Sequence, residues 1–227
     1  MAGPGAIDSV IVVTGGDPVD PAHLDELPAG AFVIAADSGI EHALAAGLHI
    51  DVAVGDFDSV APSALQAAAD AGAAVERHPE AKDETDLELA LDAAAARGAT
   101  RVYVLGGHGG RLDHLLANAL LLASPRYAHL SLVARMGAAR VTVVRDEATL
   151  AGSVGDLVTL LAVGGPADGV TTEGMRFPLR AETLHPGSTR GVSNELSLPV
   201  ATVRVATGVL LAIQPGQTGT HHTRTIT

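Results

Sequence analysis

The chain has 227 residues, 47% of them hydrophobic, and a formal net charge of −12. This length suits one large domain or two modest ones. The acidic charge argues against a nucleic-acid surface or an anionic membrane as a partner. An aromatic content of only 2% argues against a platform for stacking bases, and no apolar run reaches the ~18 residues that a membrane-spanning helix needs.

Cysteine is absent, which excludes disulfides and thiolate metal sites and permits a reducing compartment. The N-terminal sequence has no basic region followed by an apolar core, so we expect no signal peptide. Together these features lead us to expect a cytoplasmic protein.

Strands and helices alternate in the first part of the chain. The hydrophobic pattern predicts strands at 8–13, 31–36, 52–54, 73–76 and 101–105, and helices at 40–46, 62–72, 85–98 and 113–123. Thr85 followed by Glu88 has the pattern of a capping box at the start of the third helix. In the fourth helix we expect Leu115, Leu116, Ala119 and Leu122 to face inward. The alternation predicts an α/β domain with a parallel sheet covered on both faces.

The pattern changes after about Gly137. Short β-branched or apolar runs, separated by glycine and proline, occur at 141–144, 157–162, 170–172, 200–205 and 209–213. They predict a second, all-β domain, a small sandwich. We therefore expect an N-terminal α/β domain over residues 1–137, a C-terminal all-β sandwich domain over 138–218 and a polar tail over 219–227.

Two aspartates follow the predicted strand at 52–54. Asp56 and Asp58 are separated by one residue, so in an extended segment both carboxylates point to the same side. Two carboxylates 4 Å apart repel by about 4 kcal/mol at an effective dielectric near 20. A hard cation such as Mg²⁺ offsets that repulsion. The alternative interpretation is that both acids are solvated and cap turns.

More polar residues gather at the carboxyl ends of predicted strands and the starts of helices, where parallel sheets bind ligands. They are Asp37, the run Lys82-Asp83-Glu84-Thr85-Asp86, the run Gly109-Gly110-Arg111-Leu112-Asp113-His114, and Asn118. Free N–H groups of helix first turns, with Lys82 and Arg111 beside them, suit phosphates. With acids as metal ligands, the set predicts phosphoryl or pyrophosphoryl transfer. Each residue alone also has a structural alternative in a turn or a helix cap.

The motifs, taken in order, resemble those of the thiamine pyrophosphokinase (thiamine diphosphokinase) family. The first three are Gly55-Asp56-Phe57-Asp58-Ser59, Lys82-Asp83-x-Thr85-Asp86 and Gly109-Gly110-Arg111-x-Asp113-His114. Residues 171–179 and 191–195 are similar to the thiamine-binding half of that family. The resemblance therefore covers most of the chain.

The resemblance implies a fold and a reaction. The α/β domain would hold ATP and Mg²⁺, and the β-sandwich would bind thiamine. The protein would be a homodimer whose site is shared between subunits. The reaction would move the β,γ-pyrophosphate of ATP onto the hydroxyl of thiamine and release AMP.

The resemblance also implies roles position by position. Metal-binding acids would be Asp56, Asp58 and Asp83, and the catalytic set would add Asp86, Arg111 and Asp113. The nucleotide site would include Asp37, Lys82, Thr85, Gly109, Gly110, His114 and Asn118. Thiamine would contact Phe177, Ser193 and Asn194. Some family members carry Trp where this chain has Phe177, and the smaller ring weakens contact with a cationic heterocycle.

Two other functions fit the same motifs. One is a pyrophosphokinase for another heterocyclic alcohol, such as a hydroxymethylpterin. The other is a non-catalytic module that senses nucleotide or thiamine, although such a module has no need of so many carboxylates. The general base stays open among Asp37, Asp86 and Asp113, and activation of the hydroxyl by metal coordination alone is a further alternative.

Overall fold

The computed structural model describes residues 7–79 and 83–216. The chain divides into two compact units, residues 1–137 and 138–227, called here the N-terminal unit and the C-terminal unit. Lys82 and the tail expected over 219–227 lie outside the described residues.

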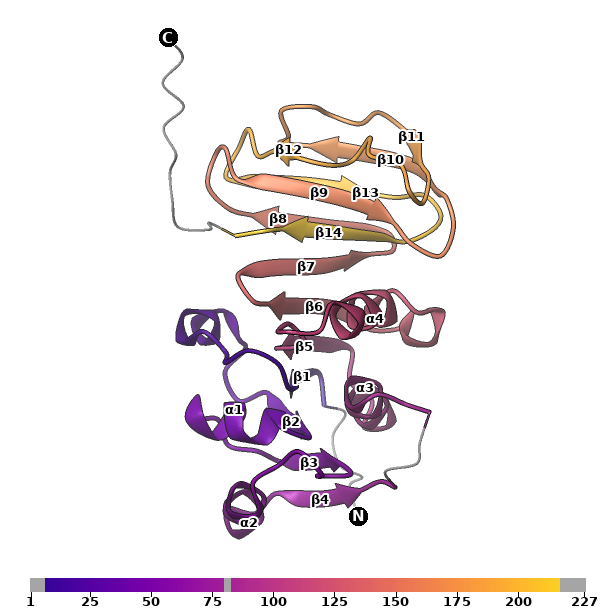
Figure 1. Ribbon diagram of the computed structural model, residues 1–227. Helices are drawn as coiled ribbons and strands as arrows, with labels where there is room; N and C mark the ends of the chain where they lie inside the picture. Colours follow the sequence, from indigo (N-terminus) through magenta and orange to yellow (C-terminus); the bar gives the residue numbers. More distant parts are fainter. Residues whose placement is uncertain (1–6, 80–82, 217–227) are drawn as a thin grey trace, which may run out of the picture. The chain divides into compact units, whose positions relative to one another are not determined.

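The N-terminal unit is built on a parallel sheet (Figure 1). Its strands are β1 (Ser9–Val13), β2 (Phe32–Ala36), β3 (Val52–Gly55), β4 (Ala74–Arg77), β5 (Arg101–Leu105) and β6 (Ser131–Met136). They lie in the order β6-β5-β1-β2-β3-β4, and every neighbouring pair is parallel. The predicted parallel sheet is confirmed. The pattern did not predict β6, because Ser131 and Arg135 interrupt its apolar residues.

Helices cover both faces of this sheet, with α1 and α2 on one side and α3 and α4 on the other (Figure 1). The helices are α1 (Gly39–Ala45), α2 (Pro62–Asp70), α3 (Asp86–Ala96) and α4 (Leu112–Leu122), and two 3-10 turns are η1 (Pro21–Glu26) and η2 (Pro125–Tyr127). On the α1 side, Ile11, Val33 and Ile40 belong to one buried cluster. Burial on both faces explains why β1, β2 and β3 read as nearly continuous apolar runs.

The ends and faces of α3 and α4 test the helix predictions. Thr85 caps α3, and its hydroxyl accepts a hydrogen bond from the Glu88 N–H at 3.3 Å, as predicted. In α4, Leu122 is fully buried. The prediction that Leu116 faces inward is wrong, because its side chain is 54% exposed. Residues four apart share a helix face, and Leu116 lies on the same exposed face as Leu112 and Leu120.

The C-terminal unit is all β. Its strands are β7 (Ala139–Val144), β8 (Glu147–Ala151), β9 (Leu157–Ala162), β10 (Ala167–Glu173), β11 (Glu182–Leu184), β12 (Asn194–Glu195), β13 (Val200–Arg204) and β14 (Leu210–Gln214). They form two antiparallel layers, β12-β9-β14-β7 and β11-β10-β13-β8. Val144, Leu160, Val170 and Val203 belong to one buried cluster that both layers share. The expected sandwich is confirmed. Strands β8, β11 and β12 were not predicted, because they are short or polar.

Among the described residues, no helix combines the length and the apolar character that crossing a bilayer requires.

Candidate active site

The strand order of the N-terminal unit reverses between β1 and β5. The chain builds β1 to β4 outward in one direction, then returns to place β5 and β6 on the other side of β1. In open α/β sheets, ligands bind beyond the carboxyl ends of the strands at such a reversal. The loops that follow β1 and β5 therefore mark the expected position of a ligand.

These two loops are joined by their backbones. The Gly107 N–H donates to the Gly15 carbonyl at 2.8 Å, and the Asp17 N–H donates to the His108 carbonyl at 2.6 Å. Glycine is required at Gly16, because a Cβ there would lie 2.1 Å from the His108 carbonyl oxygen. The His108 Nδ1 lies 3.1 Å from an Asp17 carboxylate oxygen, and both side chains are accessible. Sequence reasoning passed over Asp17 and His108, although the glycines around them signalled a close approach.

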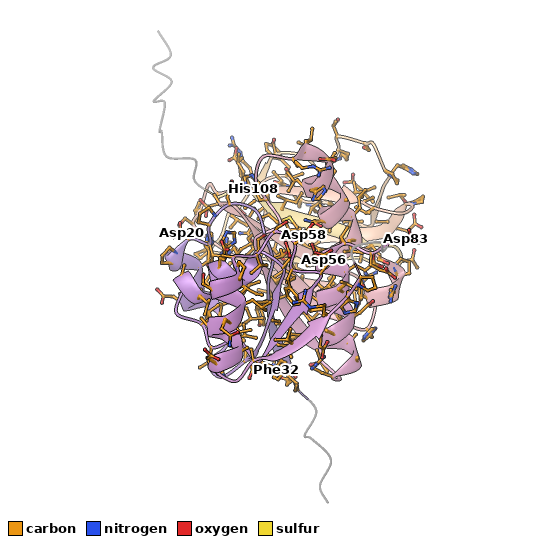
Figure 2. The ribbon with its side chains drawn as sticks, turned by 60° about the horizontal axis from the view of Figure 1, so that its bottom comes forward. Asp20, Phe32, Asp56, Asp58, Asp83 and His108 are labelled. Carbon is orange, nitrogen blue, oxygen red and sulfur yellow. The ribbon has the colours of Figure 1, made fainter. Side chains whose placement is uncertain are left out.

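Three carboxylates lie close together at the ends of β2 and β3. One oxygen each from Asp37, Asp56 and Asp58 lies within 4.8 Å of the other two. Asp37 follows β2 and is 6% exposed, whereas Asp56 and Asp58 follow β3 and reach solvent. Figure 2 shows Asp56 and Asp58 together and Asp83 apart from them. Asp83, which the sequence also proposes as a metal ligand, is not a member of this group.

The backbone around these acids is unusual. Asp37 and Phe57 both have positive φ, 45° and 64°, a region that residues other than glycine rarely occupy and that costs roughly 1–3 kcal/mol. The Asp37 N–H donates to the Val54 carbonyl at 3.0 Å, which joins the ends of β2 and β3. Gly55 allows this approach, because a Cβ there would lie 3.3 Å from the Asp37 nitrogen. Local strain is therefore concentrated where the carboxylates meet.

The charge of Asp37 is poorly compensated. Its Oδ1 atom is buried without a hydrogen-bond partner. Burial raises the pKa of Asp37 above its ordinary value, and the neighbouring carboxylates of Asp86, Asp56 and Asp58 act in the same direction. A backbone hydrogen bond from Ser38 acts in the opposite direction. A buried carboxylate oxygen without a partner is costly unless a cation pairs with it. Three carboxylate oxygens at this spacing are the donor set that a hard cation such as Mg²⁺ prefers, so the residues present fit that ion.

Arg111 and Asp113 form a bidentate ion pair at the start of α4. The Arg111 Nε donates to Asp113 Oδ1 at 3.2 Å, and its Nη2 donates to Oδ2 at 2.6 Å. The guanidinium lowers the pKa of Asp113 to about 2. Both side chains are about two-thirds exposed, so the guanidinium is accessible to an anionic ligand that takes the place of Asp113.

Of the other two residues proposed on α4, one is exposed and one is buried. His114 is exposed on the helix surface. Asn118 is buried, and its Nδ2 donates to the Gly107 carbonyl at 3.3 Å. Asn118 thus holds the glycine loop after β5, in which Gly109 and Gly110 also take positive φ.

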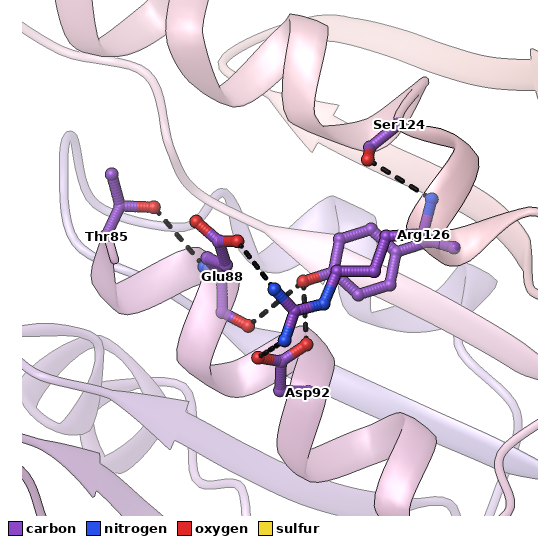
Figure 3. Close-up of polar contacts among 6 residues, drawn as sticks. Thr85, Glu88, Asp92, Ser124 and Arg126 are labelled. Atoms are coloured by element: carbon purple, nitrogen blue, oxygen red, sulfur yellow. Dashed lines mark hydrogen bonds and ion pairs between the residues drawn. The ribbon is translucent and has the colours of Figure 1, made fainter. Parts of the chain in front are cut away.

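A polar network anchors α3 against η2, with the capped start of the helix beside it (Figure 3). The Tyr127 hydroxyl donates to an Asp92 carboxylate oxygen at 2.9 Å. Arg126 pairs with Asp92 at 2.6 Å and with Glu88 at 3.2 Å. The buried Tyr127 ring holds α3 in place. The first residue of α3 is Asp86, whose carboxylate helps to raise the pKa of Asp37. Sequence reasoning did not find this network, because its partners lie more than 30 residues apart.

The C-terminal unit presents Phe177 on a rigid frame. The ring is 50% exposed. Asn194 is buried, its Oδ1 accepts from the Phe177 N–H at 3.0 Å, and its Nδ2 donates to the Phe177 carbonyl at 2.7 Å. Arg176 lies over the ring at 5.4 Å. Ser193 is exposed with φ at 56°. The amide of Asn194 therefore positions Phe177 and keeps one N–H for another partner.

Two family models match the chain. The model described as "Thiamin pyrophosphokinase, catalytic domain" matches residues 25–134. The model described as "Thiamin pyrophosphokinase, vitamin B1 binding domain" matches residues 140–210. The carboxylate group and the Arg111–Asp113 pair fall in the first range, and Phe177 and Asn194 fall in the second. Asp17 lies outside both.

Named relatives agree with these matches. The chain is 28% identical over 189 residues to the thiamine pyrophosphokinase of Bacillus subtilis (strain 168), which covers 80% of this chain and 86% of the relative. The crystal structure of the Bacillus subtilis thiamine pyrophosphokinase superposes with a TM-score of 0.81 at 25% identity, over 92% of this chain and 100% of that one. The thiamin pyrophosphokinase of Geobacillus thermodenitrificans gives 0.78 at 28% identity, over 93% and 99%.

Proposed function

The chain belongs to the thiamine pyrophosphokinase family, and from that premise we propose that it transfers the β,γ-pyrophosphate of ATP to thiamine with Mg²⁺ bound. The products are thiamine diphosphate and AMP. The convergence of Asp37, Asp56 and Asp58 around an unpartnered buried oxygen is the observation that supports this reaction best. We further propose that the enzyme works in the cytoplasm, where its co-substrate ATP is available.

The N-terminal unit supplies the nucleotide and metal site in this proposal. Asp37, Asp56 and Asp58 would hold Mg²⁺, with Asp83 on the neighbouring loop as a further ligand when substrate is present. The bound ion would neutralise charge on the phosphates and polarise the phosphorus that is attacked. The loops after β1 and β5 lie at the reversal of strand order and support binding of the nucleotide there, beside Thr85, Gly109, Gly110, His114 and Asn118.

The chemical step exchanges one bond for another. The thiamine hydroxyl oxygen attacks the β-phosphorus of ATP, the bond from that phosphorus to the α,β-bridging oxygen breaks, and AMP leaves. The Arg111 guanidinium would neutralise phosphate charge once its ion pair with Asp113 has broken. The hydroxyl proton passes to a carboxylate. Asp37, Asp86 and Asp113 are the candidates for that carboxylate, and the paired Arg111 guanidinium lowers the pKa of Asp113 to about 2.

The C-terminal unit supplies the thiamine contacts. The half-exposed ring of Phe177 would stack on the cationic heterocycle, and the spare N–H of Asn194 and the exposed Ser193 would donate hydrogen bonds. The net charge of −12 attracts a cationic acceptor. Because the same charge repels ATP, bound Mg²⁺ and Arg111 have to reverse the sign locally.

We also propose that the enzyme is a homodimer whose sites draw residues from both subunits. Leu112, Leu116 and Leu120 recur every four residues on α4 and are 68%, 54% and 57% exposed. A contiguous apolar face of this kind suits a protein interface. It begins beside the Arg111–Asp113 pair, so a subunit packed there would approach the site. Light scattering should give twice the chain mass, and Leu116→Glu should halve it.

A substrate comparison tests the reaction. Purified protein is incubated with ATP, Mg²⁺ and either thiamine or a hydroxymethylpterin, and AMP is measured by chromatography. We expect AMP and thiamine diphosphate in equal amounts with thiamine, none with the pterin, and none after EDTA treatment. Release of ADP in place of AMP, or turnover of the pterin alone, would contradict the proposal.

A further inference from the structure

The turn that carries two of the three clustered acids is held in a strained form. Phe57, between Asp56 and Asp58, has φ at 64°. Its ring is only 8% exposed and packs in the core cluster on the α1 face of the sheet. Within the turn, the Asp58 N–H donates to Asp56 Oδ1 at 3.2 Å, and the Ser59 hydroxyl donates to Asp58 Oδ1 at 2.8 Å. Neither hydrogen bond involves Phe57. A contact from outside the turn that holds Phe57 would therefore oppose its strain.

Arg77 contacts this turn at two points. It is the last residue of β4 and lies opposite Gly55 in the register of the parallel pair. Its Nη1 donates to the Asp56 carbonyl at 2.9 Å. The same guanidinium lies over the Phe57 ring, 4.8 Å from the centroid. The flat, forked guanidinium can stack and donate at once, which a lysine ammonium cannot do equally well.

We propose that Arg77 is a positioning residue that keeps the Asp56-Phe57-Asp58 turn in its metal-binding conformation before the metal arrives. The inference rests on the proposed Mg²⁺ site and goes beyond it, because Arg77 contributes no ligand atom. One contact fixes the carbonyl of Asp56 and the other fixes the ring of Phe57. Together they set the backbone angles that turn both carboxylates toward Asp37.

The expected size of the effect follows from populations. When only a fraction of molecules has the competent turn, the apparent dissociation constant rises by the inverse of that fraction. Loss of the charge-assisted hydrogen bond and the stacked cation together should weaken Mg²⁺ binding about tenfold, which corresponds to about 1.4 kcal/mol.

Two substitutions separate positioning from simple charge. Arg77→Lys keeps the charge and loses the combined geometry, whereas Arg77→Met loses both. If Arg77 acted only through charge, Arg77→Lys would leave Mg²⁺ binding unchanged and Arg77→Met would tighten it, because a cation near the site repels a metal ion. Positioning instead requires both variants to bind Mg²⁺ more weakly.

Arg97 provides a matched control. Its Nη1 also donates to a backbone carbonyl, that of Ala93, at 2.9 Å, and its guanidinium lies over a phenylalanine ring, Phe32, at 5.7 Å. Phe32 begins β2, and Figure 2 shows it away from Asp56 and Asp58. Arg97 also pairs with Glu76, so Arg97→Lys should lower overall stability at least as much as Arg77→Lys does while leaving metal binding unchanged.

The experiment measures binding of the metal alone and then activity. Mn²⁺ binding to the full chain is followed by electron paramagnetic resonance. Mg²⁺ binding is followed by measuring the melting temperature at increasing Mg²⁺ concentrations. For both Arg77 variants we expect dissociation constants raised about tenfold. In the assay, the Mg²⁺ concentration for half-activation should rise similarly, with kcat recovered at saturating Mg²⁺.

The outcomes distinguish this inference from the function on which it rests. A wild-type chain that binds neither Mn²⁺ nor Mg²⁺ would overturn both. Wild-type binding with unchanged or tighter binding in Arg77→Met would overturn the role of Arg77 alone. Equal weakening in Arg97→Lys would also overturn it, because the effect would then reflect general destabilisation.

Discussion

Buried polar groups are paired differently at the carboxylate group of the N-terminal unit and around Phe177 in the C-terminal unit. At the first, Asp37 is buried with an oxygen that has no partner, and Asp56 and Asp58 stand close by. At the second, buried Asn194 makes hydrogen bonds to both backbone groups of Phe177. The first place leaves a buried carboxylate oxygen without a partner, whereas the second pairs both backbone groups of Phe177 within the fold.

The difference indicates how each half contributes. A site that concentrates like charge is unstable alone and gains most when a cation binds, so the free energy of metal binding also stabilises the fold. A site that satisfies its own polar groups is preorganised and loses little entropy on binding. The N-terminal unit therefore supplies a cluster of negative charge that a bound cation compensates, and the C-terminal unit supplies a preorganised aromatic ring.

The largest effect should come from removing one clustered carboxylate. Asp58→Asn keeps the shape of an exposed side chain and removes one charge from the proposed Mg²⁺ site, so we expect turnover to fall by on the order of 100- to 1,000-fold. Initial rates of AMP release measure this. Circular dichroism should be unchanged. Asp70→Asn, at the exposed end of α2, is the control and should keep full activity. An active Asp58→Asn enzyme would remove Asp58 from the mechanism.

The ring of Phe177 should affect one substrate only. Phe177→Ala removes the stacking surface, and we expect KM for thiamine to rise about tenfold while KM for ATP changes less than about twofold. Phe177→Trp should lower KM for thiamine, because a larger aromatic face attracts a cation more strongly. Equal effects on both KM values would place Phe177 outside the thiamine site.

Asn194 sharpens the same comparison. Asn194→Ala would release the backbone of Phe177 and leave the ring in place but mobile. Because Asn194 would both position the Phe177 ring and donate its spare N–H to thiamine, the double variant should lose more thiamine affinity than either single variant but less than the sum of the two losses. Fully additive losses would indicate that Asn194 does not act through Phe177.

The buried carboxylate of Asp37 should limit the stability of the metal-free protein. Asp37→Asn removes a buried charge that three other acids repel, so we expect the metal-free variant to be more stable by between about 1 and 2 kcal/mol. That corresponds to a rise in melting temperature of roughly 4 °C. The further rise that Mg²⁺ gives the wild type should be absent. A lower melting temperature would mean that the charge of Asp37 is compensated within the fold.

The sequence was sufficient for features encoded locally. The alternation of apolar runs predicted the parallel sheet and the sandwich, and Thr85 with Glu88 predicted the cap of α3. Asp56 and Asp58 were identified because they stand one residue apart after an apolar strand. Each of these signals lies within a few residues of chain, where periodicity and spacing suffice.

Features that depend on distant contacts were missed. Arg77 reaches the carbonyl of a residue 21 positions earlier, and His108 meets Asp17 across 91 positions. Only the fold brings such pairs together. Leu116 was placed inward because it is apolar, and nothing in the pattern of α4 distinguishes a core face from an exposed one. The role of Asp83 at the metal stays a prediction.

The smallest effect should come from the anchor of α3, and it should depend on pH. Tyr127→Phe removes a hydrogen bond to Asp92, so we expect a loss of about 0.5–1.5 kcal/mol in unfolding free energy near neutral pH. Burial and the Asp92 carboxylate raise the pKa of Tyr127 above its ordinary value of 10.0. Folding therefore opposes ionisation, and the stabilising contribution of Tyr127 is complete below pH 10 and declines above it.

Urea denaturation of the wild type and Tyr127→Phe from pH 7 to 11 measures this difference. The two curves should converge as the pH rises past 10, because the phenol ionises in the unfolded wild type and the variant has no phenol. No gap between the two proteins at any pH would show that Tyr127 contributes packing alone, because Phe keeps the ring. In that case the salt bridges from Arg126 to Glu88 and Asp92 would carry the polar attachment of α3 by themselves.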